Sequence, residues 1–363
     1  MTSHLLPFAL AASLLGAPWG ADKTARQAFD ALDTFGAGEE LATGKLSESP
    51  GEYAWGESYL LAAYVAMYEA TKDTRYLDRF VSRYRVLLSL RDDKKGRRDD
   101  LRGKMMAAWG CTGYSGGKYT CWNVHAGMLT HPAARFVRLV KERKGLRKRY
   151  GKTAMEFTVA LEETVGAFAG DWREGPEPDE AHYVEPALNG QHAPLNQQNA
   201  LGRTLLDLGA ATGERTYVEQ AAKLARFFKR RLRLRPDGTC DWSYWPALKP
   251  PYEKGSEDIS HAAINVDFAI CCYRNKIVFT REDIQRMAAT LLKVIHKGEG
   301  KFGDTVDGGG AGQYAPQIGR WGDLACVNPE VVAVLRDYFF KRDPPLGGTT
   351  TMLALATLAK YGK

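Results

Sequence analysis

Residues 70–77, with the sequence ATKDTRYL, return later in the chain as residues 211–218, with the sequence ATGERTYV. Each copy joins the end of one apolar helical pattern to the start of another through a short polar turn. In the first copy, the flanking helices cover residues 53–70 and 76–90, each with apolar side chains at the spacing of one helical face. The repeat therefore predicts the same helical hairpin at two places in one chain.

The hairpin pattern recurs along the chain, whereas strand patterns are nearly absent. Besides the segments around 53–90 and 211–218, it predicts hairpins at 124–168, 261–295 and 326–361. A single unpaired helix is predicted at 22–35. Recurrence of one unit every few tens of residues is typical of a helical solenoid or of a closed toroid.

Four long connectors decide between these two architectures. They carry many of the aromatic and polar residues, and they cover residues 91–122, 171–194, 237–260 and 298–323. A solenoid of short repeats rarely contains such loops, whereas in a toroid they gather at one mouth and build a binding cleft. We therefore predict an all-α fold, an (α/α) toroid of repeated hairpins in a single domain over residues 22–363. An open helical array that binds a protein is the structural alternative.

Composition points to an anionic partner. The chain has 363 residues and a formal charge of +7, and aromatic residues make up 11%, including 8 Trp and 17 Tyr. Such rings stack on sugars, although they also fill cores. The densest basic run, residues 141–152, lies on a predicted helix end and indicates a solvated face, so we expect no nucleic acid. An acidic polysaccharide is the expected partner.

The first residues resemble an export signal. Residues 5–16 form an apolar run of the length found in signal peptides, and small residues follow it up to Ala21. We expect residues 1–21 to be a signal peptide and the protein to be periplasmic or secreted. A helix packed on the domain is the alternative, because no Lys or Arg precedes the run. No later segment is apolar enough to span a membrane, and we expect a monomer.

Six cysteines are present, and two of them bracket a Gly- and Tyr-rich loop. Cys111 and Cys121 could form a disulfide in an exported protein. A zinc site made of these two residues and His125 is an alternative, although the spacing matches no standard pattern. Cys271 and Cys272 lie in an apolar helix, where buried thiols are expected. No catalytic metal or cofactor is expected, and a structural calcium ion beside a loop stays open.

Alignment of the hairpins predicts where the site lies. The first turn of one helix in each hairpin contains Trp55, His125, Asn196 or His261. In a toroid these turns lie around one rim, so the four side chains are expected to converge. Two of them also have a simpler explanation, because Asn196 and the residues before His261 could serve only as helix caps.

Further polar and aromatic residues near these turns complete the predicted site. The connector before the fourth hairpin carries three closely spaced aromatics, which suit a sugar-stacking surface. The Gly-rich segment 303–321 is expected to be a mobile flap that carries Tyr314 and Arg320. The full set of expected substrate-binding residues is Trp55, Glu57, Asn123, His125, Asn199, Trp242, Tyr244, Trp245 and Glu257.

A set of His, Asn, Tyr and Arg suits β-elimination at a uronic acid. That reaction removes the C5 proton beside a carboxylate, whose developing charge amide, imidazole or guanidinium groups can neutralise. A tyrosine whose pKa is lowered by a nearby positive charge can take the proton. The order of these residues along the chain, together with the predicted toroid, resembles that of the α/α-toroid polysaccharide lyases that cleave alginate and glucuronan.

The resemblance implies a role for each of four residues. Asn196 and His261 would neutralise the uronate carboxylate. Tyr314 would act as base and acid, and Arg320 would stabilise charge. The expected function is therefore a polysaccharide lyase acting on a 4-linked uronic-acid polymer.

Three other functions stay open. A uronate C5-epimerase would share the first half of the mechanism, and a glycan-binding protein would need only the aromatic residues. A glycoside hydrolase on the same toroid would need two carboxylates at the mouth. The candidate carboxylates are Glu57, Glu185, Glu253, Glu257, Asp258 and Asp307.

Overall fold

The computed structural model describes residues 24–33, 51–252, 255–342 and 345–362. The expected signal peptide and Glu253 lie outside these described residues. No helix in the described part of the chain combines the length and the apolar character that crossing a membrane requires.

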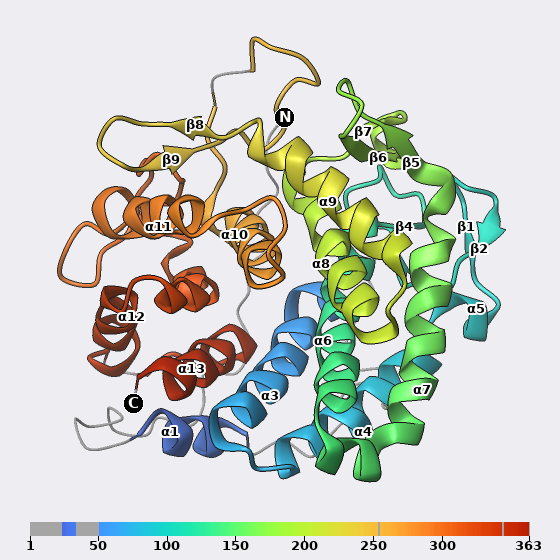
Figure 1. Ribbon diagram of the computed structural model, residues 1–363, viewed down its shortest axis with the longest axis horizontal. Coiled ribbons are helices and arrows are strands. Elements are labelled where there is room, and N and C mark those ends of the chain that lie inside the picture. The colour runs from blue at the N-terminus through green and yellow to red at the C-terminus, as the bar shows by residue number, and fades with distance from the viewer. Residues whose placement is uncertain (1–23, 34–50, 253–254, 343–344, 363) are drawn as a thin grey trace.

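Six helical elements of the described chain form a closed inner ring. Each contacts the next, and the last packs along the first, so α3 and α13 lie side by side although they come from opposite ends of the chain (Figure 1). In order around the ring these elements are α3 (Ser58–Thr71), α6 (Asn123–Glu142), α8 (Leu195–Thr212), α10 (Ile259–Arg274), η5 (Ala315–Cys326) and α13 (Thr349–Tyr361).

An outer layer of helices covers the ring, one behind each inner element. The predicted all-α toroid is therefore confirmed. In the order of the inner elements that they cover, the outer helices are α4 (Arg75–Ser89), α7 (Lys144–Ala167), α9 (Arg215–Lys229), α11 (Arg281–Ala289) with the π-helix η4 (Thr290–Ile295), α12 (Glu330–Phe340) and α1 (Ala25–Leu32).

The pairing of the last helices differs from the sequence prediction. The pattern predicts α12 and α13 as one hairpin and α1 as unpaired. In the structure α12 does contact α13, as predicted, but it also packs on the 3₁₀-helix η5, and α1 packs on α13. The sequence pattern missed η5 because this element contains Gly319 and Gly322, which lower helix propensity. Both glycines allow close packing, since a Cβ atom on Gly319 would lie 2.4 Å from that of Ala354 on α13.

Sequence explains why inner and outer helices differ. The inner helix α3 is buried on nearly all sides and is mostly apolar. The outer helix α4 buries Tyr76, Phe80, Tyr84 and Leu87 at helical spacing and exposes charged residues on its other face. Close approach inside the ring depends on Gly127, because a Cβ atom there would lie 2.3 Å from the backbone of α8.

The long connectors all run from the end of an outer helix to the start of the next inner element. They therefore lie at one mouth of the toroid, as predicted. Within them the short strands are β1 (Arg98–Asp99), β2 (Lys104–Met105), β3 (Gly110–Cys111), β4 (Thr120–Cys121), β5 (Trp172–Glu174), β6 (Ala181–Glu185), β7 (Gln191–His192), β8 (Arg233–Leu234) and β9 (Cys240–Asp241). The remaining short helices are η1 (Tyr53–Glu57), α5 (Asp92–Lys95), η2 (Ala169–Asp171) and η3 (Pro186–Leu188).

The expected disulfide between Cys111 and Cys121 does not form. In the β3–β4 ladder, Cys121 lies opposite Gly110 and Cys111 lies opposite Thr120. This one-residue offset points the two thiols to opposite faces. The thiol of Cys121 accordingly faces Asp92, whereas that of Cys111 faces His125. The same offset excludes a zinc site made of Cys111, Cys121 and His125.

A buried ion pair joins the start of the ring to its outer layer. Arg83 donates two hydrogen bonds to Glu57, at 2.6 and 2.5 Å, and both residues are almost fully buried. Glu57 therefore lies behind the rim as a structural partner of Arg83. This corrects its expected role as a substrate-binding residue.

Replacing Glu57 with Gln should lower the free energy of unfolding by about 3–5 kcal/mol, because the buried Arg83 would lose its counter-charge. The matched control is Glu156→Gln, which breaks the exposed pair with Arg85 and should cost less than about 1 kcal/mol. Urea unfolding of the two variants measures the difference. Equal costs would contradict a structural role for the buried pair.

Candidate active site

The rim at the mouth of the long connectors gathers the N-terminal ends of the inner helices. Trp55 precedes α3, His125 lies in the first turn of α6, and His261 lies in the first turn of α10. Free backbone N–H groups at helix N-termini carry partial positive charge. Several parallel inner helices therefore favour an anion at this rim.

Aromatic and imidazole rings from distant parts of the chain contact one another there. The ring of Trp55 lies 5.4 Å from that of His125 and 6.4 Å from that of His261. Tyr244 lies 5.2 Å from His261, and Tyr114 lies 6.4 Å from His125. We call these five residues the rim cluster. The predicted convergence of Trp55, His125 and His261 is thus seen in the structure.

The exposure of the rim cluster suits contact with a ligand. Tyr114 is 63% exposed, and Trp55, Tyr244 and His261 are half-buried. Flat aromatic faces of this kind can stack on the apolar face of a sugar ring. His125 lies deeper than the others and is buried.

Asp258 and His261 form a hydrogen-bonded pair. Asp258 caps α10 by accepting from the backbone N–H groups of Ser260 and His261, and its other oxygen lies 2.5 Å from Nδ1 of His261. Burial alone would raise the pKa of Asp258, but the bonds from His261 outweigh it and hold that pKa below its ordinary value. An ionised Asp258 fixes the proton on Nδ1, which leaves Nε2 as the nitrogen that can accept a proton.

His125 is held in its neutral form. Burial lowers its pKa to about 3. Its Nδ1 lies 3.9 Å from the thiol of Cys111. Gly51 makes room for the ring, because a Cβ atom there would lie only 2.5 Å from the imidazole. A neutral imidazole at this position can donate or accept one hydrogen bond toward a ligand.

Three asparagines near the rim have buried amide atoms without a hydrogen-bond partner. These atoms are Oδ1 and Nδ2 of Asn123, Oδ1 of Asn196 and Oδ1 of Asn199. Asn199 also donates to Asn265 at 2.7 Å, so part of its amide belongs to the core. Buried polar groups are normally paired. Those of Asn123 and Asn196, at the starts of α6 and α8, are therefore candidates for binding a polar ligand.

The tyrosines of the site are not set up to act as bases. Burial, followed by the charges of Asp258 and Asp304, raises the pKa of Tyr314 above its ordinary value. Burial likewise raises the pKa of Tyr244. A raised pKa keeps each phenol protonated near neutral pH, so neither is available as a base, and each O–H can donate a hydrogen bond.

Arg320 does not lie on a flap over the site, as the sequence analysis predicted. It belongs to η5, where it donates to the backbone oxygen of Ser260 at 2.8 Å and to Gln317 at 3.2 Å. Its guanidinium lies over the ring of Tyr59. Arg320 therefore belongs to the inner ring beneath the rim, and the structure shows no contact through which it would lower the pKa of Tyr314.

Two of the connector aromatics have structural roles. Trp242 is fully buried and stacks on Trp321, with ring centroids 6.5 Å apart, so it belongs to the core and not to a sugar-binding surface. Trp245 donates from its indole to the backbone oxygen of His192 and thereby holds the connector against β7. Tyr244, between them, reaches the rim cluster.

The candidate carboxylates do not form an exposed pair at the rim. Glu257 is fully buried, and burial raises its pKa well above its ordinary value. Glu185 is also buried, which raises its pKa to about 7 although Arg102 acts against the shift. Asp307 lies exposed in a turn before η5. Among these described carboxylates, only Asp258 contacts the rim cluster.

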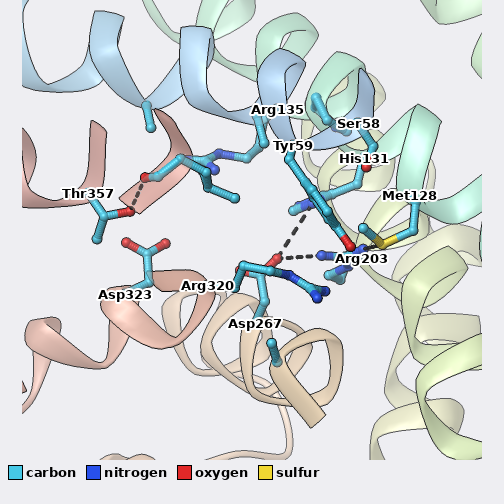
Figure 2. Close-up of a pocket in the computed structure, with 15 residues that line it drawn as sticks. Ser58, Tyr59, Met128, His131, Arg135, Arg203, Asp267, Arg320, Asp323 and Thr357 are labelled. Atoms are coloured by element: carbon cyan, nitrogen blue, oxygen red, sulfur yellow. Dashed lines mark hydrogen bonds and ion pairs between the residues drawn. The ribbon is translucent and has the colours of Figure 1, made fainter. Parts of the chain in front are cut away.

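Beneath the rim, the axis of the ring is filled by charged side chains that the sequence patterns do not reveal. Arg203 and His131 both point at Asp267, and Tyr59 and Arg320 lie beside them (Figure 2). The cavity between them is about 60 Å³, which is too small for a sugar ring. The axis itself therefore has no room for a sugar ring.

Solved structures share this fold at low sequence identity. An inactive variant of an α-1,6-mannanase from Salegentibacter sp., in complex with α-1,6-mannotriose, has a TM-score of 0.53 at 12% identity over 85% of this chain and 88% of that chain. An unsaturated glucuronyl hydrolase from Bacillus sp. GL1, responsible for the degradation of glycosaminoglycan, has a TM-score of 0.50 at 13% identity, with 84% and 85% covered.

A cellobiose 2-epimerase from Bacillus thermoamylovorans has a TM-score of 0.51 at 12% identity, over 84% of this chain and 87% of that chain. No protein-family model and no curated protein matches the sequence. At these identities the likeness establishes the fold, which is the α/α toroid found in several carbohydrate-processing enzymes.

His125 should make the protein sensitive to acid. Its native pKa is about 3, whereas an unfolded histidine titrates near 6.5, so the unfolded chain binds the extra proton between these values. As the pH is lowered through this range, the free energy of unfolding should fall in both proteins. The fall should be steeper in the wild type than in His125→Gln, by about 1.4 kcal/mol per pH unit. Urea unfolding between pH 6 and pH 4 measures both slopes, and parallel slopes would show that His125 is not held neutral.

Proposed function

We propose that this protein is a lyase that cleaves a 4-linked uronic-acid polymer by β-elimination at the rim, with His261 as the base. The observation that carries the proposal is the Asp258–His261 pair, whose half-buried imidazole lies among aromatic rings. A histidine oriented by a carboxylate is a common general base. His261 therefore replaces Tyr314 in the role that the sequence resemblance implies.

Each step of the reaction has a candidate group. Nε2 of His261 takes the C5 proton, the C4–O4 bond breaks, and a double bond forms between C4 and C5. Tyr244, which stays protonated and lies next to His261, donates a proton to the departing O4. The proton gained by His261 and the one lost by Tyr244 keep the enzyme's charge balanced over the step.

The charge that develops on the uronate carboxylate needs stabilisation. Asn196 lies at the start of α8, where its side-chain NH2 group, and not its unpaired Oδ1, would have to face the carboxylate, and the N-terminal ends of the inner helices add partial positive charge. Arg320, beneath the rim, contributes a buried positive charge. The net charge of +7 would also attract an acidic polymer.

A uronate C5-epimerase would share the abstraction of the C5 proton by His261, and it would need a second group to return a proton to the opposite face of C5. His125, the other imidazole beside Trp55, is held neutral by burial and is therefore a weak acid for this step. A glycoside hydrolase on the same toroid fits the shared fold about equally well, although among the described candidate carboxylates only Asp258 is hydrogen-bonded to the rim cluster. Export to the periplasm or the medium, and action as a monomer, remain part of the proposal.

The proposal is tested by incubating the purified protein with alginate, glucuronan and glycosaminoglycans. β-Elimination creates a conjugated double bond, so ultraviolet absorbance should rise on one polymer. His261→Ala should lower that rate by about 10²–10⁴-fold, whereas Tyr314→Phe should leave it within a few-fold. His296→Ala is the matched control, because His296 lies at the end of η4 against Phe302, away from the rim cluster.

Other outcomes distinguish the rivals. Exchange of the C5 proton with deuterated water, without chain cleavage, would favour the epimerase. New reducing ends without a double bond would contradict elimination and support a hydrolase. If Tyr314→Phe lost activity while His261→Ala retained it, Tyr314 and not His261 would be the catalytic base.

A further inference from the structure

Three potential metal ligands meet at the end of the ring opposite the rim. His131 comes from α6, Asp207 from α8 and Cys271 from α10, and all three are buried. Nε2 of His131 lies 3.3 Å from Oδ2 of Asp207 and 3.8 Å from Sγ of Cys271. The three donor atoms lie within 4.8 Å of one another.

These separations match the edges of a tetrahedral metal site. Zinc binds nitrogen and oxygen at about 2.0 Å and sulfur at about 2.3 Å, so the edges of a tetrahedron are roughly 3.3 Å for N–O and 3.5 Å for N–S. The two separations from Nε2 agree with these edges to within a few tenths of an ångström. The third edge, from Oδ2 to Sγ, is no longer than 4.8 Å and would shorten when a metal ion binds.

Asp207 has an oxygen that supports this interpretation. Its Oδ1 accepts from Arg138 at 2.9 Å, whereas its buried Oδ2 has no aligned hydrogen-bond donor and points toward His131. Asp207 is only 4% exposed. Arg138 balances part of the carboxylate charge, but a buried oxygen without an aligned donor still has a desolvation cost that a cation at Oδ2 would offset.

We propose that His131, Asp207 and Cys271 bind one divalent transition metal ion of the zinc class through Nε2, Oδ2 and Sγ. A cavity of about 240 Å³, lined by Asp207 and Cys271, lies beside the cluster and has room for a water molecule as fourth ligand. A mixed nitrogen, oxygen and sulfur set suits zinc or cobalt better than calcium, which takes only oxygen ligands.

Charged groups surround the cluster. Nδ1 of His131 lies 3.7 Å from Asp267, which is too long for a hydrogen bond but places a carboxylate on the side of the ring away from Nε2. Three arginines lie nearby, and one of them pairs with a proposed ligand, because Arg138 donates to Oδ1 of Asp207 as well as to Glu142. The other two pair with carboxylates outside the ligand set, Arg135 with Glu69 and Arg203 with Asp267.

The thiol must release its proton to bind a metal. Burial and the nearby carboxylates of Asp267 and Asp207 raise the pKa of Cys271. The metal-free thiol is therefore unreactive and protonated, and only a bound cation would make the thiolate favourable. Such an ion would tie three inner helices together at the mouth opposite the rim, so its expected role is structural.

Cobalt(II) is the probe, because thiolate ligation produces a charge-transfer band in the near ultraviolet that oxygen and nitrogen ligands do not produce. Full-length protein treated with a chelator should bind one equivalent of cobalt, show this band, and lose it when zinc is added. In Cys271→Ser the band should disappear. Cys272→Ser is the matched control, since its thiol is equally buried on the same helix but lies outside the ligand set.

Stability gives a second measurement. Zinc at 100 times its Kd should stabilise the wild type by a factor of about 100 in the folding equilibrium and should leave Asp207→Asn unchanged. A wild-type protein without the charge-transfer band would overturn the proposal, as would a band that persists in Cys271→Ser. Loss of the band in Cys111→Ser instead would place the ion at the Cys111–His125 contact and would also overturn it.

Discussion

The parallel direction of the inner helices is the constraint on which the rest of this structure depends. Because inner and outer elements alternate along the chain, every inner helix starts at one mouth and ends at the other, and the packing of α13 along α3 closes the ring. The starts bring helix N-termini and the long connectors together at the rim. The ends bring carboxylates and basic side chains together at the opposite mouth. Both proposed sites follow from this single arrangement.

Closure also explains why the axis is so polar. Inner helices are surrounded on all sides, so a polar side chain that faces the axis must find its partner on another inner helix. Arg203 with Asp267, and Arg135 with Glu69, meet this requirement between neighbouring inner helices. Such pairs are weak evidence for stability, since desolvation offsets much of their attraction. They do define which helices are neighbours.

The hairpins and part of the rim can be predicted from sequence, because both depend on periodicity. A repeated apolar face determines each helix pair, and equal positions in repeated units converge when the ring closes. For that reason Trp55, His125 and His261 meet, although they are far apart in the chain. Elements without strong hydrophobic periodicity cannot be predicted in this way. The clearest example is η5, which contains Gly319 and Gly322.

Other features depend on tertiary contacts that local sequence does not encode. A loop tryptophan can fill a core or face a ligand, and only packing against Trp321 shows that Trp242 is buried. From the sequence alone, Glu57 cannot be told apart from a carboxylate that faces the rim. Only its buried ion pair with Arg83 shows that its role is structural. His131, Asp207 and Cys271 have no motif spacing, since three separate helices bring them together.

The central claim is that the substrate binds across the rim cluster and presents a proton to His261. A crystal structure of His261→Ala with a uronic-acid tetrasaccharide tests this most directly. The account predicts a sugar ring against Trp55, its C5–H bond directed at the position vacated by the imidazole, and its carboxylate near Asn196. A tetrasaccharide bound elsewhere, with the rim cluster free of sugar, would contradict the account.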